Sequence, residues 1–190
     1  MKIFLLKLTT IFISLVLTTH LYAYEQAYTK TVVGEIQLMN LPAAKLIEAG
    51  REGSYFQQSN KLFRSLFKYI KENEIAMTVP VEGDLGTARM RFHVGKDAPT
   101  DIESSESVSV VELPARMVVS IGGKGSYKEK NVSKSQLKLE SWLNDHPSLE
   151  KAGEAYAVFW NAPFTPWFMK RFDVHIPVRQ KDQGTVANRN

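Results

Sequence analysis

The feature of this sequence that most restricts its fold is an order of secondary-structure signals that occurs twice. A segment of strand character is followed by a helix and then by two further strands, first within residues 35–94 and again within residues 108–178. Each unit leaves an apolar sheet face and an apolar helix stripe to bury. Two such units can pair their strands into one curved sheet with a helix on each side.

A change of period defines the first unit. Its helix is predicted over residues 55–71, where apolar residues recur at the i, i+3, i+4 and i+7 spacing as Phe63, Leu66, Phe67 and Ile70. Strands are predicted at residues 35–41, 45–49, 75–81 and 89–94, with a turn at residues 82–86. In the last of these strands, basic and apolar residues alternate, which is typical of a strand with one apolar face.

A polar segment at residues 96–107 connects the first unit to the second. The helix of the second unit is predicted from Ser133 to about His146, and Pro147 ends it. Strands are predicted around it at residues 108–113, 117–121, 156–160 and 173–178.

The first 23 residues have the layout of an export signal. Lys2 and Lys7 precede an apolar run at residues 11–17, which is too short to cross a bilayer, and Ala23 offers a small residue for cleavage. We therefore expect a signal peptide at residues 1–23 and an exported protein, either periplasmic or secreted. Leu21 stands where the cleavage enzyme prefers a small residue, so an uncleaved anchor is the alternative.

Charge and cysteine content exclude several classes of function. Cleavage of the leader removes Lys2 and Lys7 and lowers the formal net charge from +4 to +2. The basic residues are not gathered into a stripe interleaved with aromatics, so we expect no nucleic-acid partner, and no stable membrane insertion once the leader is removed. The chain has no cysteine, which excludes disulfides, thiolate nucleophiles and Cys-ligated metals. The oligomeric state stays open.

Two stretches resemble the SOUL haem-binding family. The run Phe63-Arg-Ser-Leu-Phe-Lys-Tyr-Ile70, followed by Ile75-Ala-Met-Thr-Val-Pro-Val81, is similar to a helix and strand of that family. The stretch from Trp160-Asn-Ala-Pro163 to Val174 is similar to the family's C-terminal motif. The resemblance covers about residues 34–178 and implies an α+β fold, a distorted antiparallel β-barrel of two βαββ repeats with two flanking helices, as in the GyrI-like domains.

The resemblance divides the chain around that domain. Residues 24–33 would be an N-terminal extension, residues 34–178 the SOUL-type domain, and residues 179–190 a polar tail. We interpret Met77-Thr-Val-Pro80 as a structural element that sets how the chain enters the barrel, because Pro80 lacks the backbone donor that a central strand needs.

The first helix is expected to carry the ligand site. Its apolar residues spread over roughly 160°, wider than the stripe of about 100° that covers a sheet, so part of the stripe can face a ligand. A porphyrin or related tetrapyrrole could stack on Phe rings and pair its carboxylates with basic side chains at the rim. The predicted ligand-binding residues are Phe56, Phe63, Arg64, Phe67 and Lys71. The alternative is that the Phe residues belong to the core and the basic residues to a solvated face.

Haem is therefore the expected ligand, without an assigned axial residue. Some family members have a histidine in the first strand, where this chain has Leu38 and Met39. His93, His146 and His175 are each isolated in the sequence, and an isolated histidine is usually structural. We expect binding by apolar contact and ion pairing, without catalysis.

Two other classes of function stay open. Asp173 and His175 share a strand face, and with Glu112 they could form the acid/base site of a small-molecule hydrolase or of a GyrI-like binder of cationic or apolar molecules. Alternatively, exposed aromatic residues could form a protein-docking patch. The candidates for that patch are Trp160, Phe164, Trp167 and Phe168.

The leader makes a prediction about the N-terminus. Protein recovered from the cell envelope should begin at Tyr24 or within a few residues of it, because cleavage is expected after Ala23. N-terminal sequencing of that fraction is the measurement. Soluble cytosolic protein that retains Met1 would contradict the prediction.

Overall fold

A computed structural model describes residues 25–181 of the chain, so the predicted leader at residues 1–23 lies outside the described residues. The elements, in chain order, are β1 (Ile36–Leu41), β2 (Ala44–Arg51), α1 (Tyr55–Glu72), β3 (Val81–Asp84), β4 (Ala88–His93), β5 (Ser109–Leu113), β6 (Arg116–Lys124), α2 (Glu129–Asn144), β7 (Leu149–Lys151), β8 (Tyr156–Phe159), the 3₁₀ turn η1 (Trp167–Met169) and β9 (Arg171–Gln180).

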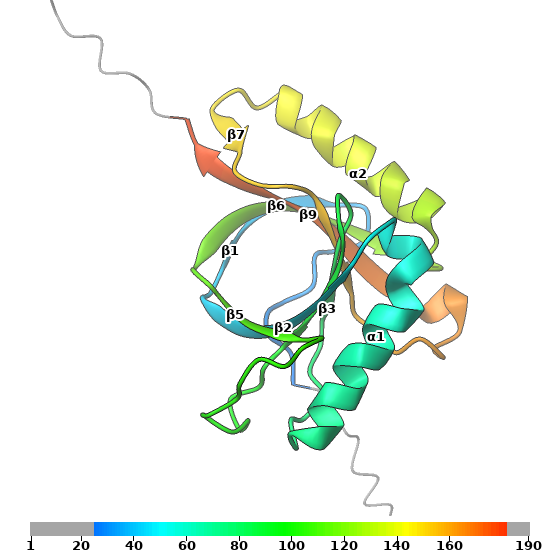
Figure 1. Ribbon diagram of the computed structural model, residues 1–190. Helices are drawn as coiled ribbons and strands as arrows, with labels where there is room; N and C mark the ends of the chain where they lie inside the picture. The colour runs from blue at the N-terminus through cyan, green and yellow to red at the C-terminus, as the bar shows by residue number, and fades with distance from the viewer. Residues whose placement is uncertain (1–24, 182–190) are drawn as a thin grey trace, which may run out of the picture.

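All the strands belong to one curled antiparallel sheet, and both helices lie on its outside (Figure 1). The strand order is β1-β6-β9-β8-β3-β4-β2-β5, and the short β7 pairs with β9. This order is symmetric: read from the other end, each strand is replaced by its counterpart in the other unit, with β1 matching β5, β2 matching β6, β3 matching β8 and β4 matching β9. The two predicted repeats are therefore confirmed, and they meet where β3 pairs with β8. Each unit also lends its first strand to the other, since β1 pairs with β6 and β5 with β2.

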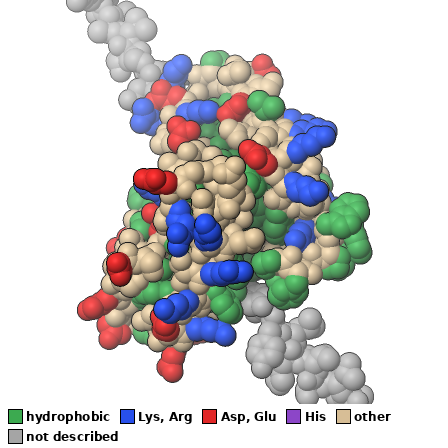
Figure 2. All heavy atoms as spheres, turned by 45° about the vertical axis from the view of Figure 1, so that its right-hand side comes forward, with side chains coloured by type: hydrophobic (Ala, Val, Ile, Leu, Met, Phe, Trp, Pro, Cys, Tyr) green, Lys and Arg blue, Asp and Glu red, His purple; other side chains and the backbone are tan. Residues whose placement is uncertain are grey.

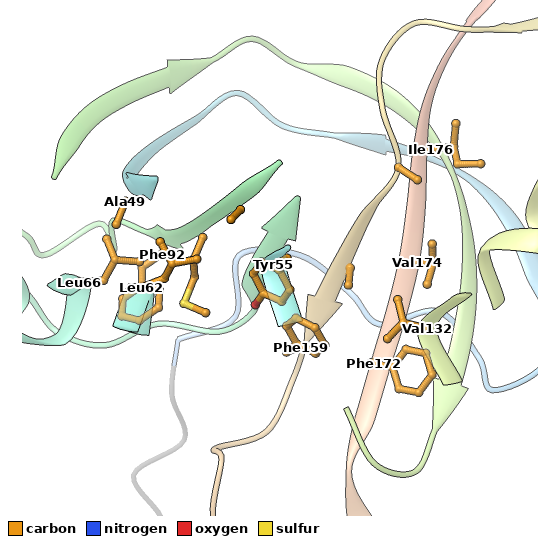
Figure 3. Close-up of a cluster of buried hydrophobic side chains, with 14 of the residues drawn as sticks. Ala49, Tyr55, Leu62, Leu66, Phe92, Val132, Phe159, Phe172, Val174 and Ile176 are labelled. Atoms are coloured by element: carbon orange, nitrogen blue, oxygen red, sulfur yellow. The ribbon is translucent and has the colours of Figure 1, made fainter. Parts of the chain in front are cut away.

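Alternation along the strands gives the sheet two different faces. On the outer face, β4 directs Met90 and Phe92 toward α1, and β9 contributes Phe172, Val174 and Ile176 to the same core. Figure 3 shows Phe92 beside Leu62 and Leu66 of α1, and Phe172 near Val132 of α2. On the inner face, the same strands place His93, Asp173 and His175, all buried. The main hydrophobic core is thus outside the curled sheet, and its inside combines buried polar groups with a smaller apolar cluster of Tyr156, Val158 and Trp160.

Helix α1 covers one half of the outer face with an incomplete apolar stripe. Leu62, Leu66 and Ile70 are buried in the core, as the i, i+4 spacing predicts. Tyr69 is also buried, and its hydroxyl donates to the Glu103 carbonyl in the connector. The Phe residues of the helix lie at the edge of this buried stripe and are only partly covered.

The segment after α1 differs from the prediction. Residues 75–80 do not form a strand of the sheet, because their backbone bonds instead to the N-terminal segment, with Val79 N–H donating to Glu25 and Ala27 N–H donating to Val79. The strand begins at Val81, so Glu82 lies inside a strand and not in the predicted turn. The turn that joins β3 to β4 is formed by residues 85–87.

The second unit contains two smaller differences. Helix α2 begins at Glu129, one turn before the predicted Ser133, since Val132 also packs into the core. Strand β7, which the sequence analysis missed, is only three residues long and pairs with the end of β9.

Residues 25–33 run along the inside of the curled sheet. Gln26 bridges to Val79 and Val33 bridges to Gly122. Between these two points, Tyr28 packs edge-on against Trp160 and His93, and Thr31 N–H donates to Asp173 Oδ2 at 3.1 Å. This segment therefore covers part of the inner face of the sheet.

Close packing of α1 on β3 makes a prediction about stability. A methyl group at Gly83 would overlap the Tyr55 ring, so Gly83→Ala should lower the free energy of unfolding by about 1–3 kcal/mol. Gly50→Ala is the matched control, because its new methyl would lie 3.7 Å from Arg89 Cγ; it should leave stability unchanged or raise it by about 0.5–1 kcal/mol. Urea unfolding measures both, and equal effects would contradict the packing.

Candidate functional site

An apolar cavity of about 780 Å³ lies between α1, the start of β3 and the loop that joins β8 to β9. Its volume is within the range of about 300–1,000 Å³ that is usual for small-molecule sites. On the face that Figure 2 shows, hydrophobic side chains gather along a recess between flanks that carry Lys and Arg. The cavity is lined by Tyr55, Phe56, Ser59, Asn60, Phe63, Arg64, Phe67, Met77, Val79, Val81, Met90, Tyr127, Phe159, Asn161, Ala162, Pro163, Phe164 and Lys170.

Aromatic rings from both units form the walls. On α1, Phe63 and Phe67 stack with ring centroids 5.7 Å apart. Across the cavity, the Tyr127 and Phe159 rings pack with centroids 4.6 Å apart. Tyr55 stacks on Phe159 at 5.9 Å and so joins the helix to the β8 side. Because these walls come from distant parts of the chain, the cavity exists only in the folded protein.

Four of the five predicted ligand-binding residues line this cavity. They are Phe56, Phe63, Arg64 and Phe67, and the three Phe side chains are partly covered while Arg64 is exposed. The fifth, Lys71, lies outside the lining, with its Nζ 4.9 Å from the centre of the Phe67 ring. Lys71 is thus beside the cavity, at the end of its aromatic wall.

The sequence analysis missed the wall that faces α1. Met77 and Val79 line the cavity, so the stretch interpreted as purely structural also contributes to the site. From the second motif, residues 161–164 and Lys170 line it as well. The two motifs that carried the family resemblance therefore meet at one cavity. Their shared membership of one family was the signal from which the second wall of the site could have been predicted.

Tyr127 holds the far wall in place. Its hydroxyl donates to the Arg171 carbonyl at 2.9 Å and accepts from Asn161 N–H at 2.9 Å. Asn161 Oδ1 in turn accepts from Arg171 N–H at 2.7 Å, which closes the base of the β8–β9 loop. Burial raises the pKa of Tyr127 to about 12, so the hydroxyl is protonated at neutral pH.

The residues of this cavity fit a tetrapyrrole ring better than they fit iron. Aromatic walls suit the flat macrocycle, and Arg64 and Lys170 are placed to pair with carboxylate arms. Of the soft or aromatic groups that can ligate haem iron, the lining contains the Met77 thioether and the Tyr55 and Tyr127 hydroxyls. Within residues 25–181, no group of three or more acidic or histidine side chains is arranged to hold a metal ion.

The histidines considered as iron ligands lie elsewhere. His93 and His175 are on the inner face of the sheet, and His146 stacks on Trp142 at the end of α2, with centroids 3.5 Å apart. In β1, Leu38 is exposed and Met39 is partly covered, and neither residue lines this cavity.

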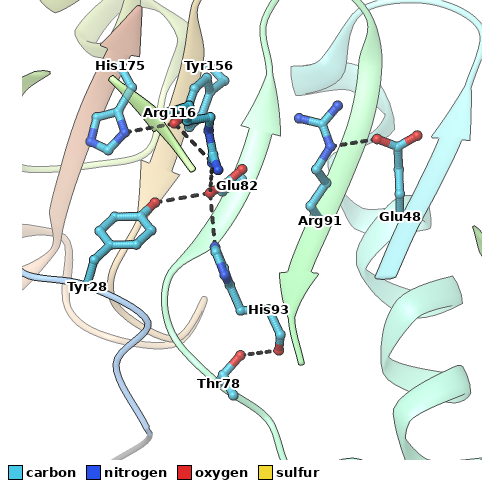
Figure 4. A network of polar contacts seen from close by, with 9 residues as sticks. All are labelled: Tyr28, Glu48, Thr78, Glu82, Arg91, His93, Arg116, Tyr156 and His175. Atoms are coloured by element: carbon cyan, nitrogen blue, oxygen red, sulfur yellow. Dashed lines mark hydrogen bonds and ion pairs between the residues drawn. The ribbon is translucent and has the colours of Figure 1, made fainter. Parts of the chain in front are cut away.

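A group of buried polar side chains surrounds Glu82 inside the sheet (Figure 4). Glu82 Oε1 accepts from the Tyr28 hydroxyl at 3.1 Å, from Arg116 Nη2 at 3.2 Å and from His93 Nε2 at 3.0 Å. Burial opposes ionisation of this carboxyl, but the contacts with His93 and Arg116 outweigh burial and lower its pKa to about 2. Glu82 is therefore an ionised, fully buried acid at neutral pH.

The predicted acid/base group is not assembled as expected. Glu112 lies on β5, where it is exposed and pairs across from Lys45, far from β9 in the strand order, so the interpretation of Glu112 as a partner of Asp173 and His175 is wrong. Glu82 takes that place, since β3 and β9 both flank β8. His175 Nδ1 lies 3.1 Å from the Tyr156 hydroxyl, which Arg116 also contacts.

Trp160 was predicted to be an exposed docking residue, and this prediction is wrong. It is buried on the inner face, where its indole N–H donates to Asp173 Oδ2 at 2.9 Å. Burial raises the pKa of Asp173 to about 6 despite the N–H groups of Thr31 and Trp160. Burial lowers the pKa of His175 to about 3.

A smaller cavity of about 380 Å³ opens near this group. Tyr28, His93 and Arg116 form its inner wall, and Glu25, Lys45 and Lys96 are among the residues at its rim. It is more polar than the cavity beside α1.

Comparison with known families agrees with the two motifs. The family model described as SOUL heme-binding protein matches residues 23–177, which is most of the chain. The chain belongs to the SOUL haem-binding family. No curated protein sequence matches the chain.

Solved structures share the fold of this SOUL protein at low identity. The chain is similar to the EcmrR C-terminal domain, with a TM-score of 0.62 and 12% identity over 77% of this chain and 98% of that one. EcmrR in a complex with DNA matches with a TM-score of 0.64 and 11% identity, over 77% of this chain and 58% of the EcmrR chain. A hydrolase from Listeria innocua matches with a TM-score of 0.52 and 11% identity, over 80% of this chain and 94% of that one.

The buried titratable groups predict an unusual acid response. Between about pH 6.5 and 3, His175 gains a proton only on unfolding, so acidification destabilises the fold. Between about pH 6 and 4, folded Asp173 keeps a proton that the unfolded chain releases, so acidification stabilises it. Asp173→Asn removes the second effect and should steepen the loss of unfolding free energy from pH 6 to pH 4 by up to about 1.4 kcal/mol per pH unit.

Urea unfolding at a series of pH values tests this response. Asp101→Asn is the control, because Asp101 is exposed in the connector and its removal should leave the slope unchanged. Parallel profiles for the wild type and Asp173→Asn would show that Asp173 titrates normally.

Proposed function

We propose that this SOUL protein binds haem or a related tetrapyrrole, without catalysis, in the cavity beside α1. The observation that carries the proposal is the meeting of both family motifs around one apolar cavity with basic side chains at its edge. Stacking on Phe63 and Phe67 would hold the macrocycle, and Arg64 and Lys170 would pair with its carboxylates.

The partly covered Phe side chains support a ligand that brings its own apolar surface. Phe56, Phe63 and Phe67 border the core without being enclosed by it. A flat ligand could cover their remaining surface with little rearrangement, because the Tyr127 and Asn161 bonds already fix the opposite wall. Iron ligation is not required for this mode of binding, and the proposal assigns no axial residue.

A hydrolase or a binder of cationic molecules receives less support. Glu82, the buried acid that could attract a cation, is already compensated by Arg116 and held by Tyr28. Asp173 is similarly engaged by Thr31 and Trp160 and lies on the opposite face of the sheet from the α1 cavity. A catalytic acid or base must reach substrate, so these bonds favour a structural role for both groups.

The expected leader supports export of the protein. We propose that the mature protein acts in the periplasm or after secretion, since residues 1–23 carry the pattern of an export signal. Within residues 25–181, no helix is long and apolar enough to span a membrane.

Haemin titration followed at the Soret band tests the proposed site. Phe67→Ala should weaken haemin binding about tenfold, roughly 1.4 kcal/mol, because the stacked wall loses a ring. Phe168→Ala is the matched control, since Phe168 is exposed and does not line the cavity. Arg64→Glu should weaken haemin more than its dimethyl ester, which cannot form the ion pair, and added salt should reduce the difference.

Lys138→Glu on α2 is the charge control, because it makes the same reversal at an exposed position on the other helix. Equal affinities of wild type, Phe67→Ala and Arg64→Glu for haemin would place the ligand elsewhere.

A further inference from the structure

The loop between β8 and β9 exposes an unusual amount of apolar surface. Its tip displays four large side chains to solvent, Phe164 at 86%, Trp167 at 67%, Phe168 at 54% and Met169 at 57% exposure. Figure 2 shows hydrophobic side chains that project from one edge of the molecule. Contiguous exposed apolar side chains of this kind mark a surface that meets an apolar partner.

Hydrogen bonds within the loop hold it in this conformation. Thr165 N–H donates to Ala162, Met169 N–H donates to Pro166, and Lys170 Nζ donates to the Pro163 carbonyl at 2.7 Å. The base is closed by Asn161 and Tyr127, as described above. Several hydrogen bonds within the loop therefore hold the conformation that displays the apolar tip.

Basic residues lie in the loop and in the segment bonded to its base. Residues 161–171 contain Lys170 and Arg171 and no acidic residue. The neighbouring segment 124–130, from the end of β6 to the start of α2, is hydrogen-bonded to this loop, since Gly125 N–H donates to the Lys170 carbonyl and the Tyr127 hydroxyl donates to the Arg171 carbonyl. The segment exposes Lys124, Lys128 and Lys130 and one acid, Glu129. An aromatic tip with a basic collar is complementary to a surface that is apolar inside and anionic outside.

From this arrangement we propose that the β8–β9 loop docks the protein peripherally on an anionic phospholipid bilayer. Phe164, Trp167 and Phe168 enter the headgroup and acyl boundary, and the lysines of the adjoining loop meet the anionic headgroups. The docking is distinct from a membrane span, since it uses one loop tip and a few side chains.

The loop also borders the α1 cavity, so docking by the loop would bring the cavity close to the membrane. Phe164 and Lys170 belong both to the loop and to the cavity lining. A protein docked by this loop therefore holds the cavity next to the membrane surface, where an apolar ligand could pass between bilayer and protein with little exposure to water. The docking itself does not depend on which ligand the cavity binds.

A bilayer fits these observations better than a protein partner does. Trp167 and Phe168 are exposed and do not line the α1 cavity, and three of the four exposed charges in the adjoining segment 124–130 are lysines. A protein interface would ordinarily surround such aromatics with a mixed polar rim.

Co-sedimentation of the full chain with phosphatidylglycerol/phosphatidylcholine vesicles tests the docking. The triple variant Phe164→Ser, Trp167→Ser, Phe168→Ser should bind at least about tenfold more weakly than the wild type. Lys128→Gln together with Lys130→Gln should weaken binding to these vesicles but not to pure phosphatidylcholine, and salt should have the same effect. Each comparison is between variants of the same chain, so any contribution of residues 1–23 is shared.

Fluorescence locates the contact on the loop. Brominated phospholipids should quench emission of the wild type, and Trp167→Phe should abolish that quenching, because Trp160 is buried and the third tryptophan, Trp142, is partly covered on α2. Leu137→Ser on α2 is the matched control, since it removes another exposed apolar side chain and should leave vesicle binding unchanged. Circular dichroism and thermal unfolding show that each variant is folded.

Two results would overturn the proposal. One is wild-type vesicle binding by the triple variant. The other is a Trp167 emission shift that depends on protein concentration without any quenching by brominated lipid, which would assign the loop to a contact between protein molecules. Neither result bears on haemin binding by Phe67→Ala, so the docking and the proposed ligand site fail independently.

Discussion

Glu82 carries a negative charge that has no access to solvent, and the segments around it compensate that charge. His93 from β4, Arg116 from β6 and Tyr28 from the N-terminal segment all contact one carboxylate oxygen. Removing one partner from such a buried group typically costs about 3–5 kcal/mol, because the remaining charge is left unpaired. This carboxylate therefore links both repeats and fixes the N-terminal segment against the inside of the sheet.

The main hydrophobic core and the cavity lie on the outer face of the curled sheet, opposite the buried polar groups. Strand alternation sends Glu82 inward and its neighbours Val81 and Gly83 outward, toward α1. The outer face must then be covered by helices, and α1 covers it incompletely. The uncovered margin, between Phe67 on the helix and Tyr127 from the second unit, is the α1 cavity. The same packing that stabilises the domain thus leaves space for a ligand.

The β8–β9 loop lines this cavity and also extends to the protein surface. Its base is fixed by Tyr127, which also forms part of the cavity wall, while its tip remains exposed. Ligand binding and surface docking would therefore share one rigid support. The low identity to the EcmrR C-terminal domain, at a TM-score of 0.62, shows that this frame tolerates very different residues.

The sequence by itself determined what depends on local periodicity. The helical spacing of Leu62, Leu66 and Ile70 and the alternation in β4 fixed the repeated order of elements, and two motifs identified the family. Phe63 and Phe67, which line the α1 cavity, could be singled out because they lie at the edge of that stripe. Tertiary structure decided the rest. The hydrogen bonds that residues 75–80 make with residues 25–27, the burial of Trp160 and Glu82, and the cavity wall from Tyr127 all depend on long-range contacts, which no local pattern records.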